Sequence, residues 1–302
     1  MPEPPADVAT TVVSPALLRD WPLSSWTERN DSKYDRGRVL VVGGAAETPG
    51  GVQLAGIAAL RVGAGHLTLA VGEPVAVTMA VAIPESGVIA LPVNRAGSVL
   101  GAGSERLEQE LAEAGAVLIG PGLDDLPQTA ELLAWAVPRL GAETSLVLDA
   151  YALGALPDLK DFVRPIAGRL VLTPNASEAE RLLEAAGPAD DASESPMSTE
   201  VRLAQSYRAV VSMGGVIAHP DGRTWRVSAG YDGLATSGSG DVMAGALTGM
   251  LAGGADPEQA AVWATYVHAA AGDRLAARIG RLGFLAREIL EELPAVMVEL
   301  QH

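Results

Sequence analysis

The chain has 302 residues, with 21 lysines and arginines against 37 aspartates and glutamates, so its formal net charge is −16. It contains no cysteine, which excludes a disulfide scaffold, a cysteine-ligated metal centre and a cysteine nucleophile. The acidity disfavours nucleic acid and anionic membranes as partners, although 34 glycines leave open anion binding through backbone amides.

The N-terminal residues lack the basic start and apolar stretch of a signal peptide, and no apolar run is long enough to cross a membrane. We therefore expect a cytoplasmic protein. Residues 1–30 are interpreted as an N-terminal extension and residues 31–302 as one domain. The segment from Leu183 to Glu200 is rich in small and acidic residues, which predicts a mobile surface connection.

Short runs of β-branched residues and leucine alternate with segments of helical period over much of the chain. Their continuous apolar character is typical of strands buried on both faces of a parallel sheet. This alternation indicates an α/β fold, a three-layer α/β/α sandwich with a mostly parallel central sheet. The predicted strands are Val39–Val42, Leu67–Val71, Val88–Leu91, Val117–Ile119, Leu146–Leu148, Leu170–Leu172 and Val210–Val211, and the predicted helices are Val52–Val62, Glu105–Ala114, Thr129–Val137 and Ala176–Ala185.

The pattern changes after Val211. Val216–His219 and Thr224–Val227 flank a Pro-Asp-Gly turn, which predicts a hairpin that closes one edge of the sheet. From Asp241 onward the chain is almost entirely helical in pattern. Helices are expected over Val242–Leu251, Pro257–Ile279 and Leu285–Leu300.

Four loops that follow predicted strands carry glycine or a carboxylate, at the edge where an open α/β sheet binds its ligands. Glycines at a strand–helix junction let backbone N–H groups converge on a phosphate, and the helix N-terminus adds partial positive charge. Each loop alone is consistent with a simple turn, but four at one edge favour a ligand site. The loops contain Gly43-Gly44 with Thr48-Pro49-Gly50-Gly51, Gly120-Pro121-Gly122, Asp149-Ala150, and the run from Leu234 to Asp241.

The loop Gly238-Ser239-Gly240-Asp241 carries the strongest functional signal. Its backbone provides amide donors for a phosphate, and its carboxylate stands in the first turn of an apolar helix. That carboxylate could simply cap the helix. A cap does not need glycine on both sides of Ser239, however, so we favour Asp241 as a general base that faces a hydroxyl in phosphoryl transfer.

These motifs, together with Leu172-Thr173-Pro174, resemble the ADP/ATP-dependent NAD(P)H-hydrate dehydratases of the ribokinase-like superfamily. The resemblance runs from about Lys33 to the C-terminus, and the run from Gly233 to Asp241 is its most specific part. It implies a lyase that repairs nicotinamide nucleotides by removing water from hydrated NADH or NADPH, coupled to hydrolysis of ADP or ATP. Mg²⁺ is expected with the nucleotide phosphates. A homo-oligomer and a separate epimerase are also expected.

The resemblance also implies roles for individual residues. Carried over by position, Asp241 is the catalytic acid/base group at the substrate hydroxyl. The substrate, the hydrated nicotinamide nucleotide, would contact Gly51, Gly122, Asn175 and Asp241. The adenine nucleotide would contact Met213, Gly214, Gly215, Gly238, Ser239 and Gly240. No dedicated metal ligands are visible in the sequence.

Three positions depart from the family pattern. Asn175-Ala176-Ser177-Glu178 stands where His-Pro-Gly-Glu is usual, and Asn175 with Glu178 also fits a helix capping box. Met213 stands about where the family has a lysine, and Tyr231-Asp232-Gly233 replaces Asn/Thr-x-Gly. Catalytic activity is thus an open question, with two alternatives: a kinase of the same superfamily for a sugar or vitamin precursor, and a non-catalytic nucleotide-binding homologue.

The histidines give weaker signals. A lone histidine is more often a hydrogen-bonded structural residue than a ligand, which is our interpretation of His66. His268 lies in an alanine-rich segment with Trp263 and Tyr266, so we interpret it as core or interface packing. His219 is expected to be exposed on the predicted hairpin. No spacing such as His-Glu-x-x-His indicates a metal site.

Overall fold

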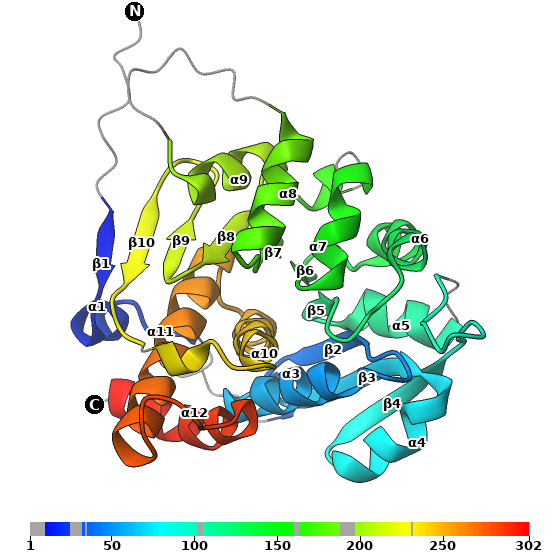
Figure 1. The fold of residues 1–302 in the computed structure, drawn as a ribbon, viewed down its shortest axis with the longest axis horizontal. Helices are drawn as coiled ribbons and strands as arrows, with labels where there is room; N and C mark the ends of the chain where they lie inside the picture. Colours follow the sequence, from blue (N-terminus) through cyan, green and yellow to red (C-terminus); the bar gives the residue numbers. More distant parts are fainter. Residues whose placement is uncertain are drawn as a thin grey trace, which may run out of the picture.

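The computed structural model describes residues 10–24, 32–33, 35–101, 105–159, 163–187, 197–230 and 232–301. Within these ranges ten strands form one sheet in the order β1-β10-β9-β8-β7-β6-β5-β2-β3-β4 (Figure 1). Strand β9 is antiparallel to both of its neighbours, and the other pairings are parallel. The predicted, mostly parallel sheet is therefore confirmed.

The strands are β1 (Thr11–Val13), β2 (Arg38–Gly43), β3 (His66–Gly72), β4 (Ser86–Leu91), β5 (Ala116–Ile119), β6 (Ser145–Leu148), β7 (Leu170–Leu172), β8 (Val210–Met213), β9 (Val216–Ala218) and β10 (Thr224–Val227). The helices are α1 (Pro15–Asp20), α3 (Gly50–Arg61), α4 (Glu73–Ala82), α5 (Glu105–Glu113), α6 (Leu126–Ala136), α7 (Tyr151–Ala155), α8 (Ala176–Ala186), α9 (Thr199–Tyr207), α10 (Ser239–Ala252), α11 (Pro257–Arg278) and α12 (Ala286–Gln301). Each predicted strand and helix has a counterpart here, whereas β1, α1, α4, α7 and α9 were not predicted.

Two hydrophobic cores lie on opposite faces of the sheet. Val39 and Val41 of β2 face one core, which is covered by α3, α4, α10, α11 and α12. Leu40 and Val42 of the same strand face the other core, which is covered by α5 to α9. Burial on both faces explains why the strands read as continuous apolar runs, and it confirms the three-layer α/β/α sandwich.

The direction in which the sheet grows reverses beside β2. From β2 the chain builds outward through β3 and β4, while the strands from β5 to β8 are added on the other side of β2 (Figure 1). The loops that leave β2 and β5 therefore diverge toward opposite layers. In open α/β sheets, ligands bind in the crevice outside the carboxyl ends of the strands at such a reversal.

The β9–β10 hairpin forms as predicted, but its position at the sheet edge was wrong. Strand β1 pairs in parallel with β10 and lies outside it, with Thr11 opposite Trp225. Trp21, just after α1, stacks on Trp225 with ring centroids 6.1 Å apart, and its carbonyl accepts from Trp263 Nε1 at 2.9 Å. Described residues of the predicted extension thus pack on the sheet and on α11.

The acidic segment before β8 has helical ends. Helix α8 continues to Ala186, and α9 begins at Thr199, so both ends of the predicted connection are ordered by their helices. The central residues 188–196 lie outside the described residues. Among the helices that are described, none is long and apolar enough to span a lipid bilayer.

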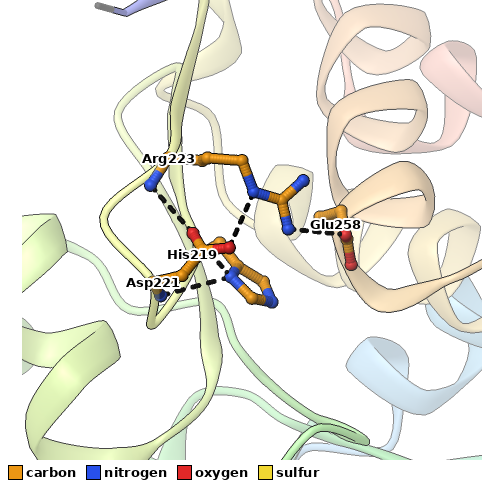
Figure 2. Close-up of polar contacts among 4 residues, drawn as sticks. All are labelled: His219, Asp221, Arg223 and Glu258. Carbon is orange, nitrogen blue, oxygen red and sulfur yellow. Dashed lines mark hydrogen bonds and ion pairs between the residues drawn. The ribbon is translucent and has the colours of Figure 1, made fainter. Parts of the chain in front are cut away.

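A polar cluster joins the tip of the hairpin to the N-terminal turn of α11 (Figure 2). Asp221 accepts from Arg223 Nε at 2.8 Å and pairs with His219 Nδ1 at 2.8 Å, while Arg223 also reaches Glu258 at 3.1 Å. Partial burial alone would raise the pKa of Asp221. Hydrogen bonds from Arg223 and His219 outweigh this effect and lower the pKa to about 2. The cluster fixes the hairpin against α11.

We expect Asp221→Asn to lower the free energy of unfolding by about 1 kcal/mol at neutral pH, because exposed ion pairs contribute no more than that. A carboxylate whose pKa is lowered by folding stabilises the fold at pH values above its ordinary pKa. This contribution is lost as the pH falls toward 2. Urea unfolding of both proteins over a pH series should therefore show a difference that shrinks with acidification. A difference independent of pH would contradict the role of the charge.

Candidate nucleotide and substrate site

The loops after β2 and β5 interlock at the reversal point. Gly44 N donates to Pro121 O at 2.9 Å, Ala45 N to Gly122 O at 2.7 Å, and Thr48 Oγ1 to the same Gly122 oxygen at 2.9 Å. Gly122 has φ +68°, and a Cβ there would lie 2.1 Å from Thr48 O. Only glycine fits this position without moving the loop. The sequence-predicted Gly122 is thus held in the crevice between the two loops.

Helix α10 packs unusually close to α3, and two glycines permit this. A Cβ on Gly245 would lie 2.1 Å from Ala55 O, and one on Gly249 would lie 2.7 Å from Ala59 O. Because these glycines are four residues apart, they share one face of α10 and form a shallow groove for α3. The close crossing brings the N-terminal turns of the two helices together.

This crossing places Asp241 of α10 beside Gly51 of α3. A Cβ on Gly51 would lie 2.9 Å from Asp241 Oδ1, so the glycine leaves room for the carboxylate. Burial raises the pKa of Asp241 to about 6. A carboxylate with this pKa is largely ionised at neutral pH yet is a stronger base than an exposed one, which suits proton abstraction from a hydroxyl.

The adjacent glycines Gly50 and Gly51 provide a matched pair of variants. Alanine at residue 51 would press on the Asp241 carboxylate, whereas a Cβ on Gly50 meets nothing within 4 Å. We expect Gly51→Ala to lower kcat by about tenfold to a hundredfold, since misplacement of a catalytic group by an ångström has effects of that size. Gly50→Ala should retain wild-type kcat. Equal kcat values for the two variants would contradict the contact.

A second carboxylate, Asp149, follows β6 and is 7% exposed. It accepts from Thr173 Oγ1 at 2.7 Å. Burial raises the pKa of Asp149 to about 7; the Thr173 hydrogen bond opposes this rise, and the charges of Asp241 and Glu178 add to it. The carboxyl groups of Asp149 and Asp241 therefore lie near one another at this edge of the sheet.

The sequence analysis placed Asp149 in a ligand-binding loop but gave it no role. The signal that could have marked it is a polar residue directly after an apolar strand, which recurs as Thr173 after β7. The next residue, Ala150, has φ +50°, a conformation that is rare for a residue with a side chain. Such strained residues are concentrated at functional sites.

A cavity of about 660 Å³ opens beside the N-terminus of α10. It is lined by the loop after β7, the β8–β9 turn, the residues after β10 and the facing side of α11. The sequence-predicted residues that line it are Met213, Gly214, Gly215, Ser239, Gly240 and Asn175. The structure therefore brings together five of the six residues predicted for the nucleotide.

Two predicted residues differ from the others in their position relative to this cavity. Gly238, predicted at the nucleotide, does not line the cavity; it is the N-cap of α10, and a Cβ there would lie 3.8 Å from Asp241 Oδ2. Asn175, predicted at the substrate, lines the same cavity as the residues predicted for the nucleotide. Its side chain also accepts from Glu178 N at 3.0 Å, while Glu178 accepts from Asn175 N at 2.9 Å, which confirms the capping box.

The first turn of α10 presents backbone donors at the cavity. The helical hydrogen bonds begin with Val242 N to Gly238 O at 3.2 Å, so the amides of Gly240 and Asp241 precede them. Gly240 is exposed and lines the cavity, and a Cβ on it would meet nothing within 4 Å, so a ligand can approach this residue closely. This helix N-terminus is therefore suited to a phosphate group.

His268 also lines this cavity, which the sequence analysis did not anticipate. Its Nε2 lies 2.9 Å from Ser239 Oγ. The alanine-rich segment around His268 indicated a packing role. Its place in the cavity was missed because no sequence pattern shows that α11 lies beside the N-terminus of α10. Over the described ranges, no group of three or more histidine and acidic side chains is arranged to hold a metal ion.

Comparisons with known proteins identify the family of this chain. A family model described as NAD(P)H-hydrate dehydratase matches residues 39–295. The chain is 43% identical, over 95% of its own length and 96% of the relative's, to the ADP-dependent (S)-NAD(P)H-hydrate dehydratase of Xanthomonas campestris. It spans about half the length of several other curated relatives, which are described as bifunctional NAD(P)H-hydrate repair enzymes.

Solved structures share the fold. A ribokinase-like superfamily protein from Enterococcus faecalis superimposes with a TM-score of 0.80 at 22% identity over 97% of each chain. The ADP/ATP-dependent NAD(P)H-hydrate dehydratase of Bacillus subtilis, co-crystallised with ATP/Mg²⁺, gives a TM-score of 0.74 at 24% identity over 96% of this chain and 99% of the other. The fold is thus ribokinase-like, and the chain belongs to the NAD(P)H-hydrate dehydratase family.

Proposed function

We propose that this chain removes water from hydrated NADH or NADPH in a reaction coupled to hydrolysis of ADP. The observation that carries this proposal is the position of Asp241, which lies against Gly51 and directly follows Gly240, a residue that lines the cavity of about 660 Å³. The X. campestris relative, 43% identical over nearly its whole length, is described as ADP-dependent, which supports ADP as the co-substrate.

The chemistry needs a phosphoryl donor because hydroxide is a poor leaving group. In the first step the substrate hydroxyl oxygen attacks the terminal phosphorus of ADP, and the bond from that phosphorus to the bridging oxygen breaks. The hydroxyl proton passes to Asp241, so the products are AMP and a phosphate ester of the hydrated ring. The raised pKa of Asp241 suits it to accept this proton.

The second step forms the reduced nicotinamide ring. The lone pair of the ring nitrogen expels inorganic phosphate as the carbon–oxygen bond breaks. Loss of a proton from the neighbouring ring carbon then restores the ring double bond. The sum is the hydrated nucleotide plus ADP giving NADH, AMP and phosphate, and no oxidant or reductant takes part.

Each part of the site has a role in this scheme. The amides of Gly240 and Asp241 would hold the transferred phosphoryl group, and Met213 with Gly214 and Gly215 would line the nucleotide cavity. Gly51 and Gly122 would admit the hydrated ring beside Asp241. Bound Mg²⁺ would neutralise charge on the phosphates; it would be held mainly by those phosphates, because the described residues offer no cluster of three carboxylates or histidines.

A dehydratase is favoured over a kinase that releases a phosphorylated product. The family match covers residues 39–295, and the X. campestris relative is described as a dehydratase. Partners and assembly are also part of the proposal: a separate epimerase would supply the reactive epimer of the hydrate, and the chain would form a homo-oligomer in the cytoplasm. Several relatives are described as bifunctional repair enzymes, which supports a second repair activity as partner.

Turnover of the hydrate tests the proposal. Purified protein is mixed with hydrated NADH, Mg²⁺ and either ADP or ATP, and the recovery of NADH absorbance is followed together with phosphate release. We expect recovery with ADP and one phosphate per NADH formed. Nucleotide binding without recovery would instead support a non-catalytic homologue. Phosphate transfer to a sugar or vitamin-precursor alcohol, without recovery from the hydrate, would support a kinase.

A further inference from the structure

The nucleotide cavity has an unusual charge composition for a site that accepts a polyanion. Among the described residues that line it there is no lysine, arginine, aspartate or glutamate. Met213 lines this cavity, and it stands about where the family pattern has a lysine. His268 is the one side chain of this described lining that can gain a positive charge.

The position of His268 relates it directly to the phosphate-binding turn. It projects from α11, which packs on α10, and its Nε2 lies 2.9 Å from Ser239 Oγ. Ser239 is the first residue of α10 and precedes Gly240, whose amide we assign to a phosphate. The imidazole, the serine hydroxyl and the helix N-terminus thus form one continuous polar wall of the cavity.

The buried position of His268 favours the neutral form of its imidazole in the free protein. Burial lowers the pKa of His268 to about 4, and a hydrogen bond with the Ser239 backbone only partly offsets this. The penalty for a buried positive charge decreases when an anion is placed beside it. A bound nucleotide would therefore raise the pKa of this imidazole.

Several charged groups on α11 and on the elements packed against it have partners of their own. Strands β7, β8 and β9 carry no charged side chain. Asp273 accepts from Gly230 N at 3.1 Å at the cavity rim, and Glu292 of α12 pairs with Arg274 and Arg278. The remaining charged residues on α11 and on the elements packed against it are Arg226, Asp241, Glu258, Arg287, Glu288, Glu291 and Glu299, together with Asp232, whose side chain lies outside the described set.

We propose that His268 is a binding residue for the phosphates of the adenine nucleotide, and that its imidazole takes up a proton from solvent when the nucleotide binds. This inference rests on the proposed function. Protonated imidazole donates from both nitrogens, so Nε2–H would donate to Ser239 Oγ. The serine hydroxyl proton is then directed away from the histidine and toward a phosphate oxygen. The pair would thereby supply the positive charge that the missing lysine would otherwise provide.

Nuclear magnetic resonance of the imidazole rings tests this proposal. The chain has four histidines, and the signal of His268 is identified by its loss in His268→Asn. Titrations of the full chain are recorded alone, with ADP and with adenosine, which lacks phosphate. We expect ADP to raise the pKa of His268 by about three units, to near neutrality, and adenosine to leave it unchanged. An unshifted signal with bound ADP, or an equal shift with adenosine, would overturn the proposal.

Affinity measurements provide an independent test. One unit of pKa shift corresponds to about tenfold in affinity. At a pH about one unit below the pKa that His268 has in the complex, calorimetry should therefore show ADP binding about tenfold weaker in His268→Asn than in wild type, and the two affinities should converge above that pKa. His219→Asn, at the distant hairpin tip, removes one histidine as a matched control and should bind ADP like the wild type.

The outcomes separate this inference from the proposed function. ADP binding with an unshifted His268 signal contradicts the role of His268 and leaves the dehydratase proposal intact. Absence of ADP binding by the wild type contradicts both. If His268→Asn does not fold, His268→Gln replaces it, and the nucleotide-dependent shift in the wild type still decides the question. A loss of ADP affinity that is equal at all pH values would indicate a purely structural role and would overturn the proposal.

Discussion

Asp241→Asn is expected to lower kcat by about a thousandfold with little change in ADP binding, because removal of a general base has effects of that order. Asparagine is nearly isosteric with aspartate and cannot accept the proton. The fold should not be weakened. Burial raises the pKa of Asp241 to about 6, so above that pH the ionised side chain destabilises the native state, and the neutral variant should be at least as stable at pH 7.

The pH dependence of wild-type activity complements this variant. A base must be deprotonated to act, so kcat/KM should fall as the pH drops through about 6, the pKa that burial gives Asp241. Asp241→Asn with near wild-type kcat would contradict the assignment of the base.

Gly240→Leu is expected to weaken ADP binding by at least a hundredfold. A Cβ on Gly240 meets nothing within 4 Å, so a larger side chain would extend into the cavity instead of into the protein. It would occupy the space that we assign to the phosphates and cover the amides of the first turn of α10. Loss of two or three charge-assisted hydrogen bonds accounts for an effect of this size, since each contributes about 1.5–3 kcal/mol.

Gly240→Ala is the matched control for the leucine variant. Alanine in a helix is about 0.5–1 kcal/mol more favourable than glycine. Thermal unfolding should therefore show the alanine variant to be slightly more stable than the wild type, with a much smaller loss of ADP affinity than the leucine variant. Opposite effects on stability and binding would identify Gly240 as a ligand-binding position. Unchanged ADP affinity in the leucine variant would contradict the location of the phosphates.

The sheet and its layers could be predicted from sequence because burial on both faces leaves continuous apolar runs. Strand β2 shows this, since alternate residues such as Val39 and Leu40 enter different cores. Strand β1 was missed because it lacks such a run. Strand β1 has three residues, two of them exposed, and it is recognisable only through its pairing with β10. The prediction that the hairpin lies at the sheet edge failed because of this strand.

The candidate site was predictable where chemistry depends on consecutive residues. The glycines and carboxylate at the start of α10 form one run of sequence, and the structure places that run beside Gly51. Partners from distant elements were not predictable. His268 meets Ser239 only because α11 packs across α10, and Asp149 lies near Asp241 only because β6 ends beside α10. Such pairs depend on helix packing, which local patterns do not specify.

The structure shows how glycines contribute to a ligand site in an acidic chain. A chain of net charge −16 needs a way to hold a polyanion. The described cavity lining offers backbone amides, small residues and one histidine in place of lysine or arginine. Glycines also set the geometry, because Gly245 and Gly249 allow the helix crossing that brings Asp241 to Gly51.

The fate of the substrate oxygen tests the central chemical claim most directly. Hydrated NADH is prepared with a heavy oxygen isotope in its ring hydroxyl and turned over with ADP and Mg²⁺ in ordinary water. If Asp241 activates that hydroxyl to attack ADP, the carbon–oxygen bond breaks afterwards and the labelled oxygen appears in inorganic phosphate. Recovery of the label in water, with none in phosphate, would show that the hydroxyl leaves without being phosphorylated and would contradict the proposed role of the site.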